Sequence, residues 1–386
     1  MFFPPISVSV SGERFSVTYH VLAADEQEAH ERALGISLEQ SVELPLSLVP
    51  PGDMRDHVIG LVDSLRPLGP GRYEAVITYA VEITGFEYLQ FLNVLFGNTS
   101  MQTGIRVMRF DLPPSLLAAF KGARFGTAGL RRLLGAPARP LLGTAIKPVG
   151  FPPQELADAA YRFALGGLDV IKEDHGLIDQ PFASFRERVA RCAEAVRKAN
   201  AETGGRSLYA PNVTGPIDQV LERAHYAKQV GATALEIMPG LAGFDAVRAL
   251  AADDELGLPI LSHPAMLGTF TISPDQGIAL QVIMGQMPRL AGADATIYTT
   301  FGGRFPTRRE DVSRLLEAIR EPLGSLKPIL PMPGGGMTVE AVPDILAFYG
   351  RDVILLISGG LYSIGPDLVD NCRRFREAVE QAAALL

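Results

Sequence analysis

Eight short apolar runs follow one another from about residue 137, and each ends in Gly, Pro or a polar residue. Amphipathic stretches of helical period, such as PQELADAAYRFALGG and DQVLERAHYAKQVG, separate them. Strands buried on both faces are continuously apolar, so this alternation is typical of a parallel sheet covered by helices. Eight strand–helix units over about 250 residues predict a (β/α)8 barrel. A doubly wound open sheet is the alternative, which the count of eight and the lack of GxGxxG after the first run disfavour. The runs are PLLGTAIKP, GLDVIKEDHG, SLYAPNVTG, ALEIMPG, LPILSHP, ADATIYTTFGG, KPILPMPGGG and DVILLISGG.

The stretch before the barrel mixes strand-like and helix-like periods. The predicted strands span 15–23, 73–82 and 105–113, and the predicted helices 26–35 and 87–97. This order predicts a small α+β, ferredoxin-like domain over residues 1–125, followed by the barrel over 126–386. A chain of 386 residues also exceeds the roughly 250–300 at which one hydrophobic core stops growing.

The composition indicates a globular chain without a nucleic-acid or membrane partner. Hydrophobic residues make up 47% and charged residues 20%, as in folded domains. The formal net charge is −8 and no basic cluster stands out, which disfavours nucleic acid. Two cysteines exclude a disulfide framework and Cys-based zinc motifs. The N-terminus lacks a basic region, and no run reaches the ~18 apolar residues of a membrane span. We therefore expect a cytoplasmic protein.

The second apolar run ends in Lys172-Glu173-Asp174-His175. Active sites of such barrels lie at the C-terminal ends of the strands. Side chains alternate along a strand, so Lys172 and Asp174 should face one way and Glu173 the other. Carboxylates and imidazoles bind divalent cations, and a desolvated lysine can add CO2 to form a carbamate, which is an anionic oxygen ligand. The alternative is an ion pair of Lys172 with Asp174 or Glu173 that only closes the barrel mouth.

Glycine runs follow the seventh and eighth strands, where barrels commonly hold a phosphate on backbone N–H groups. The alternative is a pair of tight turns that need glycine for positive φ. Two runs at this pair of strands favour phosphate. The candidate phosphate-binding residues are Gly335, Gly336, Ser358, Gly359 and Gly360.

Three further residues at strand ends are weaker candidates. Lys147 ends the first run and His263 the fifth, and each precedes a proline that favours extended geometry. A single histidine in such a place is more often a structural hydrogen-bonding group than a catalyst. Arg304 lies in a Gly-rich loop that could close over a ligand, or it belongs to a solvated face with Arg308 and Arg309.

Two segments resemble a known family. LLGTAIKPVG…GGLDVIKEDHGLIDQPFASFRERV resembles the active-site strands of ribulose bisphosphate carboxylase/oxygenase (RuBisCO), and more closely those of its form IV, RuBisCO-like relatives. FLNVLFGN resembles the N-terminal segment that carries a catalytic Asn in this family. The resemblance extends over nearly the whole chain. It implies a homodimer in which Asn93 and Glu39 of one chain complete the active site of the other.

The resemblance also implies roles for single residues. Lys172 matches the lysine that becomes carbamylated, and Asp174 matches a metal ligand. Lys147 matches the lysine that handles the proton of the enolate, and His263 matches the histidine of the fifth strand. The phosphate-binding glycines match Gly336, Gly359 and Gly360. A divalent cation and CO2, as the lysine carbamate, are the implied cofactors.

Departures from the family pattern concern the metal and carboxylation. The third ligand, a glutamate in the family, is His175 here, so Mn²⁺ or Zn²⁺ become credible beside Mg²⁺. Arg304 stands where the carboxylase has the mobile-loop lysine that contacts the added carboxylate. Four further residues of the carboxylase are replaced. Val149 stands in place of the second lysine of the first strand, and Pro264 in place of the arginine that binds the second phosphate. Leu267 and a position near Ile297 stand in place of two histidines. We therefore expect no carboxylase activity.

The expected function is enolate chemistry on a small phosphorylated keto compound. The first expectation is carbon–carbon cleavage of a phosphorylated 3-oxo sugar acid, by a transcarboxylase/hydrolase or decarboxylase acting on 3-oxo-isoapionate 4-phosphate or a related acid. The alternative is an enolase or isomerase acting on a methylthio-pentulose phosphate. A non-catalytic phosphosugar-binding protein is also conceivable, but it would not need Lys147, Lys172 and Asp174.

Overall fold

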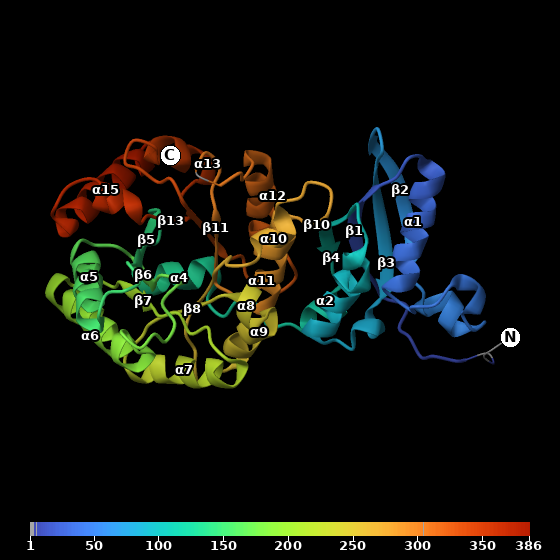
Figure 1. The fold of residues 1–386 in the computed structure, drawn as a ribbon, viewed down its shortest axis with the longest axis horizontal. Helices are drawn as coiled ribbons and strands as arrows, with labels where there is room; N and C mark the ends of the chain where they lie inside the picture. Colours follow the sequence, from blue (N-terminus) through green and yellow to red (C-terminus); the bar gives the residue numbers. More distant parts are fainter. Residues whose placement is uncertain (1–3, 5, 304) are drawn as a thin grey trace. The chain divides into compact units, whose positions relative to one another are not determined.

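The computed structural model describes residues 4, 6–303 and 305–386, and the chain divides into two compact units (Figure 1). The first unit consists of Met1–Phe120, Leu267–Gln286 and Leu323–Ser325, and the second of Lys121–Met266, Met287–Pro322 and Leu326–Leu386. Two segments from the second half of the sequence therefore belong to the unit that the N-terminal residues build.

The first unit is built on a five-stranded sheet in the order β10-β4-β1-β3-β2. Its strands are β1 (Arg14–Leu22), β2 (Leu61–Gly69), β3 (Arg72–Ala80), β4 (Ile105–Asp111) and β10 (Gly277–Ile278). β1 is central and pairs antiparallel with β3 and β4. Every second residue of β1 is buried, because one face of the strand packs on the hydrophobic core. β10 adds to β4 in parallel.

Two helices pack on the buried face of this sheet, α1 (Glu26–Glu39) and α2 (Tyr88–Phe96). The unit also contains the short helices α3 (Pro114–Ala118) and α10 (Gly268–Thr271). The side chain of Asp25 caps α1 by accepting from the backbone N–H of Glu28 (2.9 Å). Phe91 of α2 packs edge-on against Phe110 and Phe15, with ring centroids 5.0 and 5.6 Å apart. The prediction that this part of the chain mixes strands and helices in an α+β fold is confirmed. The strand β2 was not predicted, and α1 continues beyond Gly35, where the sequence predicted its end.

The second unit is a near-closed barrel of eight parallel strands, as predicted. The strands are β5 (Leu141–Ile146), β6 (Val170–Glu173), β7 (Leu208–Ala210), β8 (Leu235–Ile237), β9 (Ile260–Ser262), β11 (Ala295–Thr299), β12 (Leu330–Gly334) and β13 (Ile354–Leu356). Each of the eight apolar runs contains one of these strands. The sheet order is β7-β6-β5-β13-β12-β11-β9-β8. Backbone hydrogen bonds from Ala234 and Glu236 to the carbonyls of Tyr209 and Pro211 (3.0 and 2.9 Å) join the two ends.

Apolar side chains from all around the barrel meet in one core cluster. Its strand residues include Leu141, Val170, Leu208, Leu261, Ala295, Leu330 and Ile354, with Ala234 directly before β8. Leu130 and Leu134 of α4 (Gly126–Leu134) belong to the same cluster. The barrel interior is therefore a packed core, and chemistry is left to the ends of the strands.

Helices surround the barrel, with α5, α6 and α7 along one side and α15 near the C-terminus (Figure 1). Their bounds are α5 (Pro153–Leu165), α6 (Phe185–Thr203), α7 (Ile217–Gln229), α9 (Phe244–Ala252), α12 (Arg309–Arg320), α13 (Val342–Tyr349) and α15 (Leu368–Ala383), with short helices α8 (Pro239–Ala242), α11 (Met287–Ala291) and α14 (Gly359–Tyr362). Within the described residues, none of the helices is both long and apolar enough to cross a membrane.

Candidate active site

The end of β6 is anchored by a carboxylate that faces away from the site. Glu173 is fully buried and accepts hydrogen bonds from Arg188 at Nε (2.7 Å) and Nη2 (3.1 Å). The Tyr209 hydroxyl donates to the same carboxylate at 2.8 Å. Lys172 and Asp174 face the other way, as the alternation along the strand predicts. The Glu173–Arg188 ion pair neutralises this carboxylate and joins β6 to α6.

Lys172 forms a buried ion pair that the sequence analysis missed. Its Nζ lies 2.8 Å from Oε2 of Glu236 on β8 and donates to the backbone carbonyl of Glu173 at 2.7 Å. The side chains of Lys172 and Glu236 are 2% and 0% exposed. The alternative predicted from the sequence, an ion pair of Lys172 with Asp174 or Glu173, is therefore wrong, because the partner of Lys172 is Glu236. Burial raises the pKa of Glu236 to about 7, although the Lys172 ammonium favours its charged form.

Asp174 lies between a lysine and a histidine. Its Oδ2 is 3.1 Å from Nζ of Lys147, and its Oδ1 is 3.3 Å from Nδ1 of His175. The same Oδ1 accepts the backbone N–H of Gly176 at 3.0 Å. Burial alone would raise the pKa of Asp174, but this hydrogen bond and the charges of Lys147 and Lys172 lower it. Asp174 is therefore a carboxylate at neutral pH.

His263 follows β9 and stacks on His175, with ring centroids 4.7 Å apart and an interplanar angle of 18°. Burial, followed by the positive charges of Lys172, His175 and Lys147, lowers the pKa of His263 to about 2. Its Nδ1 accepts the backbone N–H of Ala265 at 3.1 Å. A neutral imidazole that accepts at Nδ1 carries its proton on Nε2. His263 is therefore a neutral hydrogen-bond donor.

The donor set suits a divalent cation only if Lys172 contributes. Asp174 and His175 offer one oxygen and one nitrogen ligand in contact with each other. Among the described residues, no three His, Cys, Asp or Glu side chains converge into a metal site. A carbamate on Lys172 would supply the third donor, and such a mixed oxygen and nitrogen set fits Mg²⁺, Mn²⁺ or Zn²⁺. Nζ is engaged by Glu236 in this structure, so the ion pair must rearrange before a carbamate can form.

The glycine loops after β12 and β13 combine turn geometry with open space. Gly335 and Gly336 have φ of 91° and 73°, which side-chain-bearing residues rarely adopt. A Cβ on Gly360 would lie 2.3 Å from the Met337 carbonyl oxygen. A Cβ on Gly359 would meet no atom within 4 Å, so packing does not explain that glycine. Ser358 directly precedes α14.

The loop after β13 adjoins the end of β5. β13 pairs with β5 in the sheet, and the Tyr362 hydroxyl of α14 donates to the Lys147 carbonyl at 3.4 Å. Five of the predicted residues, Lys147, Lys172, Asp174, His175 and His263, thus share one end of the barrel with the glycine loops. Arg304 lies outside the described residues.

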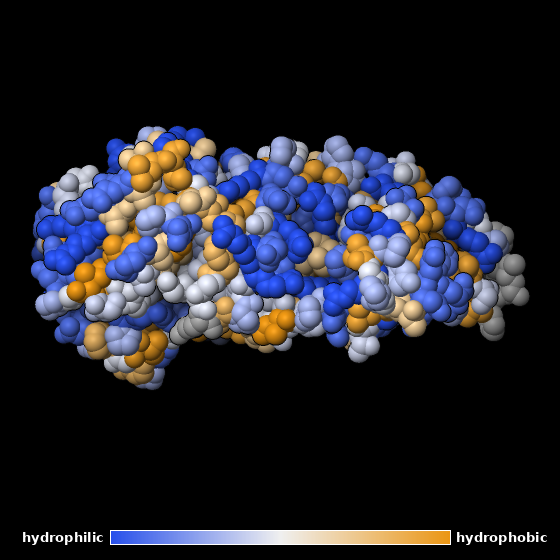
Figure 2. Space-filling view, turned by 90° about the horizontal axis from the view of Figure 1, so that it is seen from above, coloured by the Kyte–Doolittle hydropathy of each residue, from blue (hydrophilic) through white to orange (hydrophobic). Residues whose placement is uncertain are grey.

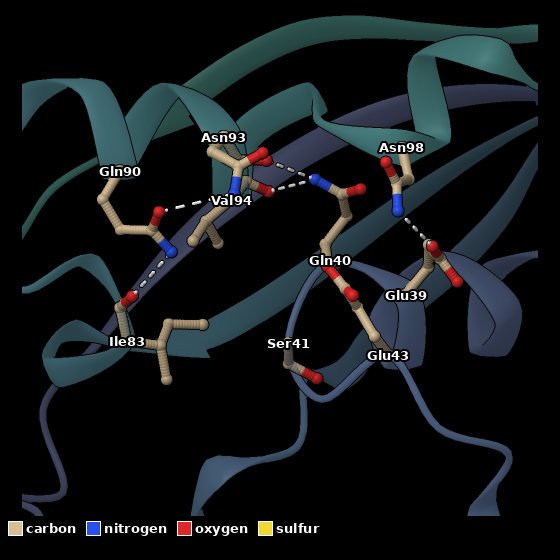
Figure 3. A pocket seen from close by; sticks show the side chains of 9 residues that line it. All are labelled: Glu39, Gln40, Ser41, Glu43, Ile83, Gln90, Asn93, Val94 and Asn98. Atoms are coloured by element: carbon tan, nitrogen blue, oxygen red, sulfur yellow. Dashed lines mark hydrogen bonds between the residues drawn. The ribbon is translucent and has the colours of Figure 1, made fainter.

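Glu39 lies in a small polar cavity of about 60 Å³ in the first unit (Figure 3). Its Oε1 accepts a hydrogen bond from Nδ2 of Asn98 at 2.9 Å. Gln40, mostly buried, donates to the carbonyls of Asn93 and Val94 at 2.7 and 2.8 Å, which joins the end of α1 to α2. The Asn93 side chain approaches Gln90 of its own helix instead (3.4 Å). Asn98, which the sequence analysis missed, is thus the asparagine that pairs with Glu39.

The sequence matches a known family across the barrel. Residues 126–380 match the family described as ribulose bisphosphate carboxylase large chain, catalytic domain. The chain belongs to this RuBisCO large-chain family. RuBisCO-like protein 1 of Rhodopseudomonas palustris is 41% identical over 95% of this chain and 98% of that protein. The 5-methylthioribulose-1-phosphate isomerase of Rhodospirillum rubrum is 38% identical over 96% of this chain and 98% of that protein.

The fold agrees with that of a solved RuBisCO-like protein. The crystal structure of the RuBisCO-like protein from Rhodopseudomonas palustris superposes with a TM-score of 0.85 and 38% identity, covering 95% of this chain and 98% of that one. The expected RuBisCO-like fold, a barrel with a sheet domain before it, is confirmed. The expectation of a RuBisCO-like, non-carboxylating enzyme is confirmed at that coarse level.

Proposed function

We propose that this RuBisCO-like enzyme isomerises a phosphorylated ketopentose, 5-methylthioribulose 1-phosphate, by moving protons through an enediolate. The observation that supports this most is the Lys147–Asp174 pair (3.1 Å) beside the neutral imidazole of His263. The near-full-length similarity to a 5-methylthioribulose-1-phosphate isomerase supports the substrate. Sequence reasoning placed carbon–carbon cleavage of a 3-oxo acid first, and this relative favours its isomerase alternative.

The isomerisation needs one proton to leave a carbon beside the carbonyl and one to return to a neighbouring carbon. When the first carbon–hydrogen bond breaks, its electron pair forms a carbon–carbon double bond and the carbonyl oxygen takes the negative charge. Lys147, 38% exposed at the end of β5, would take the proton from carbon when its amine is neutral and return it as the ammonium. Asp174 orients this amine, and its carboxylate stabilises the ammonium that forms.

His263 would stabilise the oxygen on which charge develops. Its Nε2 carries the proton and can donate, because Nδ1 accepts from the Ala265 amide. A neutral imidazole donates without giving up its proton, so it polarises the carbonyl and leaves proton transfer to Lys147. A divalent cation on Asp174, His175 and a Lys172 carbamate would add Lewis-acid polarisation of the same oxygen.

The glycine loops would hold the phosphate of the substrate. Backbone N–H groups at Gly335–Gly336 and Gly359–Gly360, with Ser358 beside them, lie after β12 and β13. Phosphates bind at this place in many barrels because the N–H groups and the start of a short helix favour anions. A single phosphate-binding site of this kind fits a substrate that carries one phosphate group.

A second copy of the chain would complete the site. Apolar side chains are exposed in the loops and helix starts after the strands: Val149, Phe151, Phe182, Ile217, Leu241, Met266, Phe305 and Tyr362, between 42% and 74% exposed. Apolar residues also stand out between hydrophilic ones on the face of the barrel unit seen in Figure 2. Exposed apolar surface of this extent is typical of an interaction site. We infer that the first unit of a partner chain, with Glu39 and Asn98, covers this end of the barrel.

Substrate turnover tests the proposed function. The protein is incubated in D2O with 5-methylthioribulose 1-phosphate, Mg²⁺ and bicarbonate, and the products are followed by ¹H and ³¹P NMR. We expect an isomeric pentulose phosphate with deuterium at the carbon that gains a proton. Parallel samples contain 2,3-diketo-5-methylthiopentyl 1-phosphate and a phosphorylated branched 3-oxo acid. Exclusive turnover of the diketone would make the protein an enolase, and cleavage of the 3-oxo acid alone would restore the first expectation.

A further inference from the structure

Another cavity, of about 480 Å³, opens at the end of the barrel opposite the candidate active site. Residues at the ends of α4, α5 and α6 line it, together with Asp169 and Ser207, which stand directly before β6 and β7. Lys147 and Asp174 of the candidate active site follow β5 and β6 instead. A strand of six residues such as β5 is about 20 Å long, at ~3.3 Å per residue. A small ligand in this cavity is therefore out of reach of the proposed catalytic groups.

Arginine dominates the charge of the cavity wall. The three arginines Arg139, Arg206 and Arg376 line the cavity. Asp169 is the one acidic residue among the described residues of the wall. Arginine keeps its proton in proteins, so three cations against one anion leave two net positive charges. Glu380 of α15 is a further anion near Arg139, but it lies outside the wall. The cavity is therefore suited to an anion.

Asp169 serves two of these arginines at once. Its two oxygens accept from Arg139 at 2.8 and 2.6 Å, and Oδ2 also accepts from Nη2 of Arg376 at 2.7 Å. One carboxylate therefore neutralises one of the two guanidinium groups. Nη1 of Arg376 is buried and has no hydrogen-bond partner within the described residues. A buried donor without an acceptor is unfavourable, and an acceptor oxygen in the cavity would remove that cost.

Arg206 is the third arginine of the wall, and it is exposed. It takes part in no hydrogen bond or ion pair within the described part of the chain, so its charge is left for a ligand. Its side chain packs over Gly135 at the end of α4, where an added Cβ would lie 3.4 Å from Cδ and 3.5 Å from Nη1. A guanidinium group presents a planar fork of N–H donors that fits two oxygens of a phosphate or carboxylate.

The rest of the wall offers apolar contact and open space. Leu134, Leu165 and Leu168 line the cavity. Gly167 and Gly204 also line it, and a Cβ on either would meet no atom within 4 Å outside the flanking residues. The volume lies in the range of about 300–1,000 Å³ that is usual for small-molecule pockets. A ligand with an anionic group and a neutral body therefore fits this cavity better than a bare ion.

We propose that this cavity, the arginine cavity, is a binding site for a small organic phosphate. The phosphate oxygens accept from the guanidinium groups of Arg206 and Arg376, and the neutral body of the ligand contacts Leu134 and Leu165. A phosphate ester carries a charge of about −1.5 to −2 at neutral pH, which matches the two net positive charges of the wall better than one carboxylate does. The site is separate from the glycine loops after β12 and β13, so it does not rest on the proposed function.

Arginine footprinting of the whole protein tests the site without any variant. Phenylglyoxal modifies accessible guanidinium groups, and peptide mass spectrometry gives the modification rate at each arginine. We expect ribose 5-phosphate to slow the modification of Arg206 several-fold, while Arg197 of α6, with a side chain 69% exposed, reacts at an unchanged rate. Ribose and succinate in parallel samples should protect Arg206 much less. An unchanged rate at Arg206, equal protection by ribose or stronger protection by succinate would overturn the proposal.

The same footprint in Gly359→Ala separates the arginine cavity from the proposed catalytic phosphate site. The glycine loops lie at the other end of the barrel, so Arg206 should be protected as in the wild-type chain. Loss of the protection in this variant would assign it to the catalytic end and contradict the proposal. If the proposed function fails, the expected protection of Arg206 stays the same.

The variant Arg376→Gln tests whether the second arginine binds the same ligand. It keeps Arg139 as the partner of Asp169 and removes one guanidinium group from the wall. We expect the ribose 5-phosphate concentration for half-protection of Arg206 to rise about tenfold, as for the loss of a charge-assisted hydrogen bond. An unchanged concentration in the folded variant would contradict the proposal. If this variant does not fold, the footprint of the wild-type chain decides.

Arg351→Gln is the matched control for that variant. Arg351 also contacts α15, by donating to the carbonyl of Ala383 at 3.2 Å, but it does not line the cavity. Half-protection of Arg206 should need the same ribose 5-phosphate concentration as in the wild-type chain. An equal rise in both variants would assign the effect to general loosening of α15 and would contradict a specific role for Arg376.

Discussion

Lys147 is the residue on which the proposed proton transfer depends. Its amine is held 3.1 Å from Asp174 but remains partly exposed, so it can reach a bound substrate. Lys147→Met removes the proton carrier and keeps most of the side-chain volume. We expect kcat to fall by about 10²–10⁴-fold, with loss of deuterium incorporation at the substrate carbon and little change in the melting temperature.

Lys198→Met provides the control for that variant, because Lys198 is a mostly exposed lysine on α6. It should leave kcat and deuterium exchange unchanged. Exchange at the wild-type rate in Lys147→Met would show that another group carries the proton.

Asp169, directly before β6, should stabilise the opposite end of the barrel. Its carboxylate accepts from Arg139 (2.8 and 2.6 Å), Arg376 (2.7 Å) and the Leu142 amide (2.8 Å). Burial alone would raise the pKa of Asp169, but Arg139 and Arg376 lower it. Asp169→Asn leaves two arginines without their anion and should cost about 3–5 kcal/mol of unfolding free energy.

The effect of Asp169 should depend on pH with a definite sign. Because the folded pKa lies below the unfolded value of about 3.9, the stabilisation is present above pH ~4 and is lost as the pH falls through the folded pKa. Urea unfolding of the two proteins at pH 7 and at pH 3 measures this. The difference between them should shrink at the lower pH, and a constant difference would assign the effect to packing.

At the scale of single elements, two of the differences from prediction have clear physical causes. β2 is the last strand in its sheet, only partly buried, and contains Pro67, which an edge strand tolerates. Its sequence therefore lacks the clear alternation that predicts a strand. Gly35 lies inside α1, because the buried residue Ile36 after it extends the apolar face of the helix. Packing outweighs the low helix propensity of one glycine.

Two residues near the candidate sites, Glu236 and Asn98, were not predicted from the sequence, and the elements that carry them give the reason. Glu236 stands within the apolar run ALEIMPG, where alternation gives no sign that a lysine of another strand will face it. Asn98 follows Gly97 just beyond α2, and only the end of α1 brings Glu39 to it. Lys147, Lys172, Asp174 and His263 could be predicted because strand ends share one edge of a barrel.

The loop between β13 and α14 offers a sharp test of phosphate binding. Gly359→Ala adds a methyl group that meets no atom within 4 Å outside the flanking residues and the backbone of its own helix, so the fold should be unchanged. A phosphate held by the backbone N–H groups would be pushed away, and loss of one charge-assisted hydrogen bond should raise KM by about tenfold or more.

Gly360→Ala is the informative comparison. Its Cβ would lie 2.3 Å from the Met337 carbonyl, so this variant should lower the melting temperature as well as raise KM. An unchanged KM in Gly359→Ala, with normal stability, would place the phosphate elsewhere.

For the whole molecule, the barrel was predictable because eight apolar runs report burial on both faces of each strand. Which segments make up each unit could not be predicted from the sequence. Leu267–Gln286 and Leu323–Ser325 belong to the first unit, although they lie within the barrel part of the sequence. β10 in the first of these segments pairs with β4 over only two residues, a signal too short for any periodicity. Tertiary packing decides to which unit such segments belong, and a local sequence pattern does not report it.

The proposed shared site predicts complementation between two inactive chains. Lys147→Met disables the barrel end, and Glu39→Gln removes the carboxylate that accepts from Asn98 in the first unit. Each homodimer would lack one half of every site. A mixed dimer pairs one intact barrel end with one intact first unit, so it regains one complete site, and random mixing in equal amounts should restore about a quarter of the wild-type activity. The chains are mixed, allowed to exchange, and assayed beside each variant alone, with the assembly followed by sedimentation. Activity that stays at the level of the single variants in a verified mixed dimer, or full activity of a monomer, would mean that each chain completes its own site.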